Sequence, residues 1–414
     1  MNFKILILLV LCFASTSYSQ QNVDVFLIAR NTGEKILANN DTIRTFGFAN
    51  SLGVHPTVPG PTIIANEGDS VHIDLWNVSQ GAPHTIHLHG LDVDQQNDGV
   101  PHLSFSIEHM DHGYYHFKAP HAGTYLYHCH VASTIHVQAG MYGLIIIKPS
   151  DGSNTTWNGG HPYTNEHSYF LSEIDTLWHT DSVLMHDHDP NLTIHTVEIP
   201  KYDPQFFLVN GLSDHQLIDS TVEFVSAVNQ MDYIRLANIG YYGTRVILPT
   251  GLNARIVASD GRPLPTEEIS DTVVLYPGER FGVLTEPDME FQSQIIYEYF
   301  DLNTMTVRGT QVVPVIVSGF ANTTTLSTAP DAVKVYPNPF NAFTTVEFEL
   351  EEASKTRVRM FDIHGKLIDE IPFKLYEKGT NTLTIGDKLT HKGTYIIQVT
   401  IQGKGDTFQR IIKM

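Results

Sequence analysis

Short runs of apolar and β-branched residues, separated by turns, dominate the chain. Residues 70–76, 124–130 and 143–148 are such runs, and Gly, Pro, Asn and Asp are frequent between them. No helical periodicity extends beyond a few turns. Repeated short strands at this spacing are typical of β-sandwiches, so the pattern predicts an all-β protein.

Histidine content and turn-rich segments divide the chain into blocks. Residues 21–149 hold 13 of the 22 histidines, residues 150–320 hold seven, and residues 333–414 hold two. The Thr- and Ser-rich segment 321–332 has the composition of a linker. With 414 residues, each of the three blocks is long enough to bury a core of its own, and we expect three domains.

Residues 1–19 have the pattern of a secretory signal peptide. Lys4 is followed by the apolar run 5–14 and by Ser17-Tyr18-Ser19, a small-residue cleavage site. No later stretch is apolar for long enough to span a bilayer. We therefore expect an exported, soluble mature chain whose sole thiol is Cys129, since the other cysteine lies in the signal.

The charge balance argues against one class of partner. The chain has 25 Lys and Arg against 45 Asp and Glu, a formal charge of −20. Binding of nucleic acid requires a dense basic surface, so no nucleic-acid partner is expected.

The histidine spacing predicts two donor groups on one strand. Residues two apart in a strand face the same side, so His87 pairs with His89 and His128 pairs with His130. Cys129 must then face the opposite side. A single HxH pair is a weak signal, because a polar strand face gives the same pattern. Two pairs together with the cysteine predict a thiolate site on one face and an imidazole site on the other.

The donor types favour copper. One Cys with two His and a distant Met suits a blue-copper centre, and Cys129, His136 and Met141 run in that order, with His84 upstream to complete the set. Zinc is less suitable because CxxC pairs are absent. The other four form an all-imidazole set suited to copper that binds and reduces O₂: His87, His89, His128 and His130.

Residues 21–149 resemble a cupredoxin domain of the multicopper oxidase family. The resemblance lies in residues 58–77 (VPGPTIIANEGDSVHIDLWN), 84–90 (HTIHLHG), 97–101 (NDGVP) and 123–143 (GTYLYHCHVASTIHVQAGMYG). It implies a secreted, laccase-like copper oxidoreductase that oxidises a phenol, an amine or a metal ion and reduces O₂. It also implies type 1 copper ligands at His84, Cys129, His136 and Met141, a type 2 ligand at His87, and type 3 ligands at His89, His128 and His130. The residues carrying catalysis would then be His87, His89, His128, Cys129 and His130.

Residues 150–320 resemble the middle, copper-free domain of three-domain laccases, in segments such as FLSEIDTLWH (170–179) and LYPGERFGVL (275–284). The resemblance implies two cupredoxin-like Greek-key β-sandwiches in this protein. The one HxH pair of the block, His186 with His188, lies in a polar segment that we interpret as a solvated loop.

The resemblance also leaves the imidazole site short of ligands. A full cluster in this family takes eight imidazoles from four HxH pairs, and this chain offers two clear pairs. Our hypothesis is a homo-oligomer in which the first domains of two copies face each other. Two alternatives stay open. One is a non-catalytic type 1 copper protein for electron transfer or copper binding. The other is a copper nitrite reductase, which His130 disfavours because that family lacks the second histidine of HCH.

Residues 333–414 predict a small β-sandwich, from alternating apolar residues and Gly turns. VYPNPFN (335–341) and GTYIIQV (393–399) resemble the C-terminal sorting domain of the type IX secretion system of Bacteroidetes. The resemblance implies the type IX secretion machinery as a partner and an extracellular or cell-surface location. His364 and His391 in this block are not ligand candidates.

Several other residues of the first block stay without a firm role. Residues 106–115 (SIEHMDHGYY) predict an exposed turn, with extra surface copper binding as the alternative. Each copper-binding imidazole needs a partner for its second nitrogen. The candidates for that role near the cluster are Asp92, Asp94 and Asp98.

Overall fold

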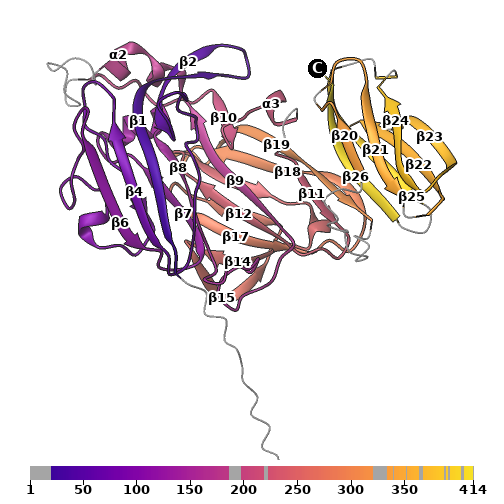
Figure 1. The fold of residues 1–414 in the computed structure, drawn as a ribbon. Coiled ribbons are helices and arrows are strands. Elements are labelled where there is room, and N and C mark those ends of the chain that lie inside the picture. Colours follow the sequence, from indigo (N-terminus) through magenta and orange to yellow (C-terminus); the bar gives the residue numbers. More distant parts are fainter. Residues whose placement is uncertain are drawn as a thin grey trace, which may run out of the picture. The chain divides into compact units, whose positions relative to one another are not determined.

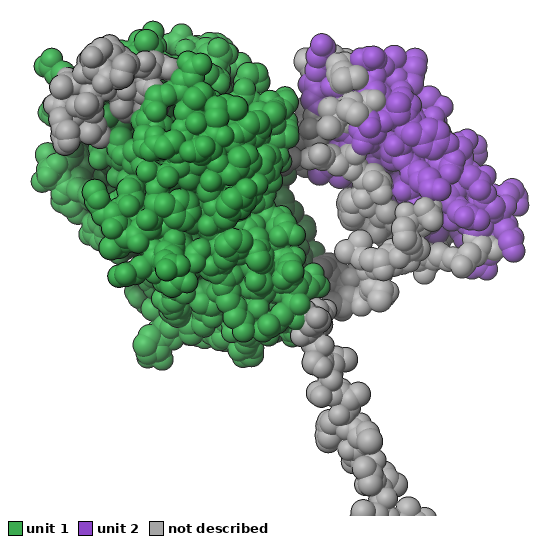
Figure 2. Space-filling view, turned by 60° about the vertical axis from the view of Figure 1, so that its left-hand side comes forward, with its two compact units in different colours: residues 1–321 green, residues 322–414 purple. Residues whose placement is uncertain are grey.

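A computed structural model describes residues 20–185, 197–218, 222–319 and 333–413, except for 339, 351, 363–366, 387, 390–391 and 402–404. The expected signal peptide 1–19, the linker 321–332, the 186–188 pair, His364 and His391 lie outside these residues. The chain forms two compact units, residues 1–321 and 322–414 (Figure 2).

The first unit begins with a sandwich of two four-stranded sheets, in the orders β2-β1-β4-β6 and β3-β8-β7-β5 (Figure 1). One buried core contains residues of both sheets, among them Leu27, Ile73, Tyr127 and Ile145. Strands β1 and β4 pair in parallel, as do β3 and β8, so the chain crosses between the two sheets. The elements are β1 (Asn22–Ile36), β2 (Thr42–Ala49), β3 (Ile63–Asn66), β4 (Ser70–Asn77), β5 (His87–His89), η1 (Gln95–Asn97), β6 (His112–Lys118), β7 (Gly123–His128), α1 (Ser133–Ala139) and β8 (Tyr142–Lys148).

The second sandwich of this unit has sheets ordered β10-β9-β12-β17-β14-β15 and β11-β19-β18-β13-β16. A separate buried core joins them, with Leu171, Ile234, Val283 and Tyr297 among its residues. The strands are β9 (Asn165–Ile174), β10 (Phe206–Val209), β11 (Phe224–Ala227), β12 (Asp232–Asn238), β13 (Gly243–Ile247), β14 (Arg255–Ser259), β15 (Arg262–Ile269), β16 (Thr272–Leu275), β17 (Arg280–Thr285), β18 (Phe291–Phe300) and β19 (Val307–Ser318). The short helices are η2 (Thr176–His179), α2 (Asp181–Leu184), α3 (His215–Ile218) and η4 (Thr250–Leu252).

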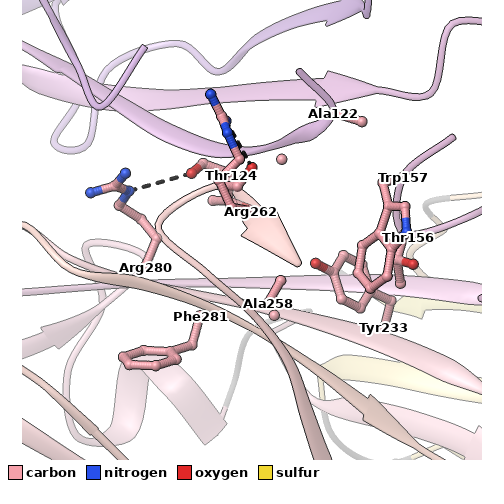
Figure 3. Close-up of a pocket in the computed structure, with 12 residues that line it drawn as sticks. Ala122, Thr124, Thr156, Trp157, Tyr233, Ala258, Arg262, Arg280 and Phe281 are labelled. Atoms are coloured by element: carbon pink, nitrogen blue, oxygen red, sulfur yellow. Dashed lines mark hydrogen bonds between the residues drawn. The ribbon is translucent and has the colours of Figure 1, made fainter. Parts of the chain in front are cut away.

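Strand β7, which leads into Cys129, lies between the two sandwiches. All its residues are buried, because Leu126 packs against Phe170 and Ile239 of the second sandwich while Tyr127 lies in the first core. Polar contacts complete this junction: Arg280 Nε lies 3.4 Å from the main-chain oxygen of Thr124 (Figure 3). The face that carries Leu126 is therefore the face that meets the second sandwich.

The second unit is a smaller sandwich with sheets ordered β20-β21-β24 and β23-β22-β25-β26. Its core includes Val346, Phe348, Ile397 and Val399. The strands are β20 (Val333–Tyr336), β21 (Thr344–Leu350), β22 (Ser354–Asp362), β23 (Leu367–Tyr376), β24 (Gly379–Ile385), β25 (Gly393–Ile401) and β26 (Gly405–Lys413). The all-β prediction is thus confirmed. Within the described part of the chain, no helix has the length and apolar character needed to cross a bilayer.

Candidate metal centre

Strand pairing sets the direction of each donor. Strands β5 and β7 are antiparallel, with His87 opposite His128 and His89 opposite Leu126. His128 lies two residues after Leu126, so its side chain faces the second sandwich, with those of His87 and His89. Cys129 faces the other way and belongs to the core of the first sandwich. The structure thus has the predicted alternation at His128 and Cys129, but the strand ends at His128, earlier than the sequence pattern predicts.

Three donors meet in that core: His84, Cys129 and His136. The Sγ of Cys129 lies 3.3 Å from Nδ1 of His136 and 3.6 Å from Nδ1 of His84. All three residues are fully buried. Met141 is buried in the same core, and its main-chain oxygen accepts a 3.0 Å hydrogen bond from the amide of Cys129. Three donors from separate positions in the chain are therefore brought together, and Met141 lies in the same core.

Local structure fixes each member of this buried group. His84 exchanges two main-chain hydrogen bonds with Ile107. His136 lies on α1, a helix that the sequence pattern did not predict. Gly140 ends that helix at φ 116°, which glycine adopts without steric cost, and the amide of Met141 then donates to the oxygen of His136. The helix therefore turns His136 inward and returns the chain to Cys129.

The buried group favours a thiolate. Burial by itself opposes the charged form, but attraction to His136 and the hydrogen bonds with His136 and His84 outweigh it and lower the pKa of Cys129 to about 5. A thiolate with two imidazoles and a thioether in a closed apolar core is the donor set that copper takes in blue-copper sites. The residues present fit that metal.

The second donor group contains only imidazoles. Donor atoms of His87, His89 and His128 lie within 4.8 Å of one another. His130 is adjacent but outside this trio, with its ring centroid 5.2 Å from that of His87. Desolvation lowers the pKa of His89 to about 4 and that of His128 to about 3, so both rings are neutral at pH 7 and their lone pairs can bind a metal.

Main-chain oxygens orient two of these rings. Nδ1 of His87 lies 2.8 Å from the oxygen of Asp98, and Nδ1 of His128 lies 3.0 Å from the oxygen of Cys129. A carbonyl oxygen only accepts, so each Nδ1 carries the proton and each Nε2 keeps its lone pair for a metal; in the absence of metal, Nε2 of His128 lies 3.4 Å from Nδ1 of His89. Of the three candidate aspartates, Asp98 alone takes this role; Asp92 pairs with Arg262, and Asp94 caps η1.

The imidazole group opens into a pocket of about 220 Å³, lined by His89, His128, residues of helix α1 and residues of the second sandwich. Gly278 lies close to one of these rings: a Cβ added there would lie 3.0 Å from Cε1 of His89. The Arg280 charge is the next cause, after burial, of the low pKa of His89. Sequence reasoning did not identify these two residues, because nothing in their local motif points to His89.

The second sandwich adds no histidine to either donor group, as far as the described residues extend. His161 instead lies 2.6 Å from a Glu267 oxygen, and His179 lies 2.7 Å from the main-chain oxygen of Arg44. The imidazole group within one chain therefore consists of residues of the first sandwich.

The segment 106–115 differs in part from its prediction as a turn. Met110 is exposed at φ 66°, as a turn residue is, but β6 already begins at His112. His109 is held by the main-chain oxygen of Ser79 at 2.7 Å. The turn therefore ends earlier than expected, because residues 112–118 pair with β4.

Comparison with known proteins finds one family match in the first sandwich and another in the C-terminal unit. Residues 39–152 match the multicopper oxidase family model, and residues 334–414 match the secretion system C-terminal sorting domain. L-ascorbate oxidase of Nicotiana tabacum is 25% identical over 262 residues, which cover 58% of this chain and 43% of that protein. The chain thus spans less than half the length of this relative.

Two further similarities concern smaller copper proteins. The blue copper oxidase of Nitrosomonas europaea superposes with a TM-score of 0.56 at 27% identity, covering 72% of this chain and 86% of that one. The copper-containing nitrite reductase of Alcaligenes xylosoxydans xylosoxydans is 30% identical over 145 residues, 34% of this chain and 41% of that protein.

The sorting domain indicates type IX secretion to the outside of the cell or to its surface. In the multicopper oxidase family copper is the cofactor, and the two donor groups are consistent with copper sites. The first sandwich of this chain is a multicopper oxidase domain, and its C-terminal unit is a type IX secretion sorting domain.

Proposed function

We propose that the protein is a secreted, laccase-like copper oxidoreductase. His84, Cys129, His136 and Met141 bind a type 1 copper, and His87, His89, His128 and His130 bind type 2 and type 3 copper. The observation that carries the proposal is the back-to-back placement of the two donor groups, joined through the His128–Cys129 peptide. When bound, copper supplies the redox chemistry, passing single electrons from the reductant to O₂, which becomes water.

The chain's own residues provide position, insulation and a path. The closed core around Cys129 excludes water from the sulfur. The oxygens of Asp98 and Cys129 hold the rings of His87 and His128 with Nε2 directed away from the main chain. Because Cys129 is bonded directly to His128 and His130, only a few covalent bonds would separate copper held by the thiolate group from copper held by the imidazole group.

A second copy of the chain completes the imidazole site in this proposal. The family's cluster needs eight imidazoles, and the described residues of one chain bring four together. His87, His89 and His130 are only partly buried, so the second sandwich does not cover them completely. Two-fold pairing of first sandwiches then gives about 2.5 coppers per chain, because two chains share three cluster coppers.

The sorting domain and the N-terminal pattern together support export. Residues 1–19 act as the signal for the inner membrane, and residues 333–414 direct the chain through the type IX machinery. The reductant, a phenol, an amine or a metal ion, therefore meets the enzyme outside the cell.

The test is a copper count, an absorption spectrum and O₂ uptake on the copper-loaded full chain. We expect a blue band, about 2.5 coppers per chain and O₂ consumption with a phenol, a diamine or ferrous ion. One copper per chain with a blue band and no O₂ uptake would exclude the cluster. Removal of the blue band by Cys129→Ser, but not by His109→Asn, would locate the type 1 copper.

The same preparation separates the two alternatives. An electron carrier is favoured by the absence of second-sandwich histidines, among the described residues, from the imidazole group; it would be blue but show no turnover. The similarity to a nitrite reductase favours the other alternative. Nitric oxide release from nitrite, without O₂ uptake, would identify that activity.

A further inference from the structure

A further pair of histidines meets on the outer face of the first sandwich, on the sheet that contains neither β5 nor β7. His72 on β4 and His116 on β6 are direct cross-strand partners. Their Nδ1 atoms lie 2.6 Å apart, and their ring centroids lie 4.6 Å apart. Strand alternation directs both side chains outward, since Ile73 and Tyr115, which adjoin them, lie in the buried core.

We propose that His72 and His116 form a separate surface site for a divalent transition-metal ion, with Cu(II) preferred over Zn(II). Two imidazoles on adjacent strands form a chelating pair whose spacing is set by the sheet. Imidazole nitrogen is a common ligand of both ions, and its affinity follows an order in which Cu(II) exceeds Zn(II).

The spacing of the two nitrogens favours copper geometry. With metal–nitrogen bonds of about 2.0–2.1 Å, adjacent ligands of a square-planar ion lie about 2.9 Å apart, and those of a tetrahedral ion about 3.3 Å apart. The observed 2.6 Å is closer to the square-planar value. The rings need to separate by only a few tenths of an ångström to bind Cu(II).

Neighbouring residues hold His72 ready for a metal. The hydroxyl of Ser70 lies 3.1 Å from Nε2 of His72. A proton on Nε2 donates to that hydroxyl and leaves the lone pair of Nδ1 directed at His116. His116 is positioned by its amide, which donates to the side-chain oxygen of Asn97 at 2.6 Å. Without metal, Nδ1 of His116 donates to Nδ1 of His72. Metal binding requires only that this proton move to Nε2 of His116.

Two acidic residues, Asp24 and Asp74, share the exposed face of the pair, which also carries the cation Lys118. The exposed Asp24 is the register partner of His72 on the other side of β4. Asp74, two residues after His72, lies 2.7 Å from Nδ1 of His112. These carboxylates add negative potential that attracts a cation, and water completes the coordination of an ion held by two imidazoles.

The test adds Cu(II) alone to the copper-loaded full chain after loosely held metal has been removed with a chelator. Calorimetric titration should detect about one additional Cu(II) per chain, with an electron paramagnetic resonance signal that shows coupling to nitrogen. The double variant His72→Asn/His116→Asn should bind this ion at least tenfold more weakly. The control His55→Asn/His102→Asn removes two exposed histidines that lie on no common strand pair and should bind it as the parent does.

The blue band reports whether the variants fold, since it arises from the buried group. If the double variant loses that band, the single variant His116→Asn is used instead, because His116 lies on an edge strand. It must still lower the affinity for the additional Cu(II) at least tenfold. Unchanged affinity in a folded His72/His116 variant would overturn the proposal, as would an equal loss in the control. Zn(II) that displaces the bound Cu(II) at equal concentration would overturn the stated preference.

Discussion

The buried thiolate group and the open imidazole group include neighbouring residues, Cys129 and His128, yet they differ in how far they are buried. His84, Cys129 and His136 are fully buried within one sandwich, whereas His87 and His89 are only partly buried beside a pocket. The first group has its donors within one chain and excludes water. The second group faces a pocket between the two sandwiches, is only partly covered, and has room for ligands from elsewhere.

This difference shows how one strand can serve two purposes. A site that accepts and releases single electrons benefits from a rigid, dry surrounding, and core packing provides it. In the proposed function the imidazole group admits O₂, and such a site cannot be sealed in the same way. Alternation of side chains across β7 gives each site its own environment at the shortest possible separation.

The largest effect should come from removal of the thiolate. Cys129→Ser leaves an oxygen that binds copper poorly in this geometry, so we expect complete loss of the blue band and substrate oxidation at background. The imidazole group should still take up copper, measured by metal analysis. A variant that stays blue would show that the sulfur is not a ligand.

Removal of one imidazole should instead lower O₂ uptake and leave the blue band in place. We expect His87→Asn to lower O₂ uptake by at least about a hundredfold, because loss of a ligand costs no less than loss of a residue that supports one. The blue band should persist. His109→Asn is the matched control, since that ring contacts the main chain of Ser79 and no other histidine of the site. Equal losses in the two variants would contradict the assignment.

The stability of the structure around the buried thiolate group should depend on pH. Glu173 is fully buried, and its main-chain oxygen accepts from Gln138 on the helix that carries His136. Burial raises the pKa of Glu173 from 4.5 to about 7, against the hydrogen bonds it accepts from Tyr241, Tyr202 and Tyr242. The folded state therefore keeps a proton that the unfolded chain releases.

The free energy of unfolding should consequently fall as pH rises from 4.5 to 7, by on the order of 3 kcal/mol in total. Glu173→Gln should remove this dependence. Urea unfolding of the copper-free chain, followed at acidic and at mildly alkaline pH, measures the change. An identical pH dependence in parent and variant would show that the carboxyl titrates normally.

The smallest effect should come from the wall of the open group. Gly278→Ala places a Cβ 3.0 Å from His89 at φ 87°, which strains the backbone by about 1–2 kcal/mol and displaces the ring. We expect O₂ uptake to fall severalfold with the blue band unchanged. Gly152→Ala, at φ 68° with no atom within 4 Å, imposes similar strain without that contact and should keep full activity.

Much of the candidate site could be predicted from the sequence, because strand alternation is a local property. The opposite directions of Cys129 and its neighbouring histidines follow from the period of two along β7. The nature of the donors, one thiol among imidazoles, also follows from composition. The short helix α1 could not be predicted, since its seven residues are too few to show a helical period.

The sequence by itself determined which side chains are available and how each alternates along its strand. Only the tertiary structure decided which of them meet. His84 reaches Cys129 across 45 positions, Gly278 reaches His89 from the other sandwich, and His72 meets His116 across 44 positions. Those encounters depend on sheet order, register and packing between sandwiches, which arise from contacts distributed over the whole unit and leave no local pattern in the chain.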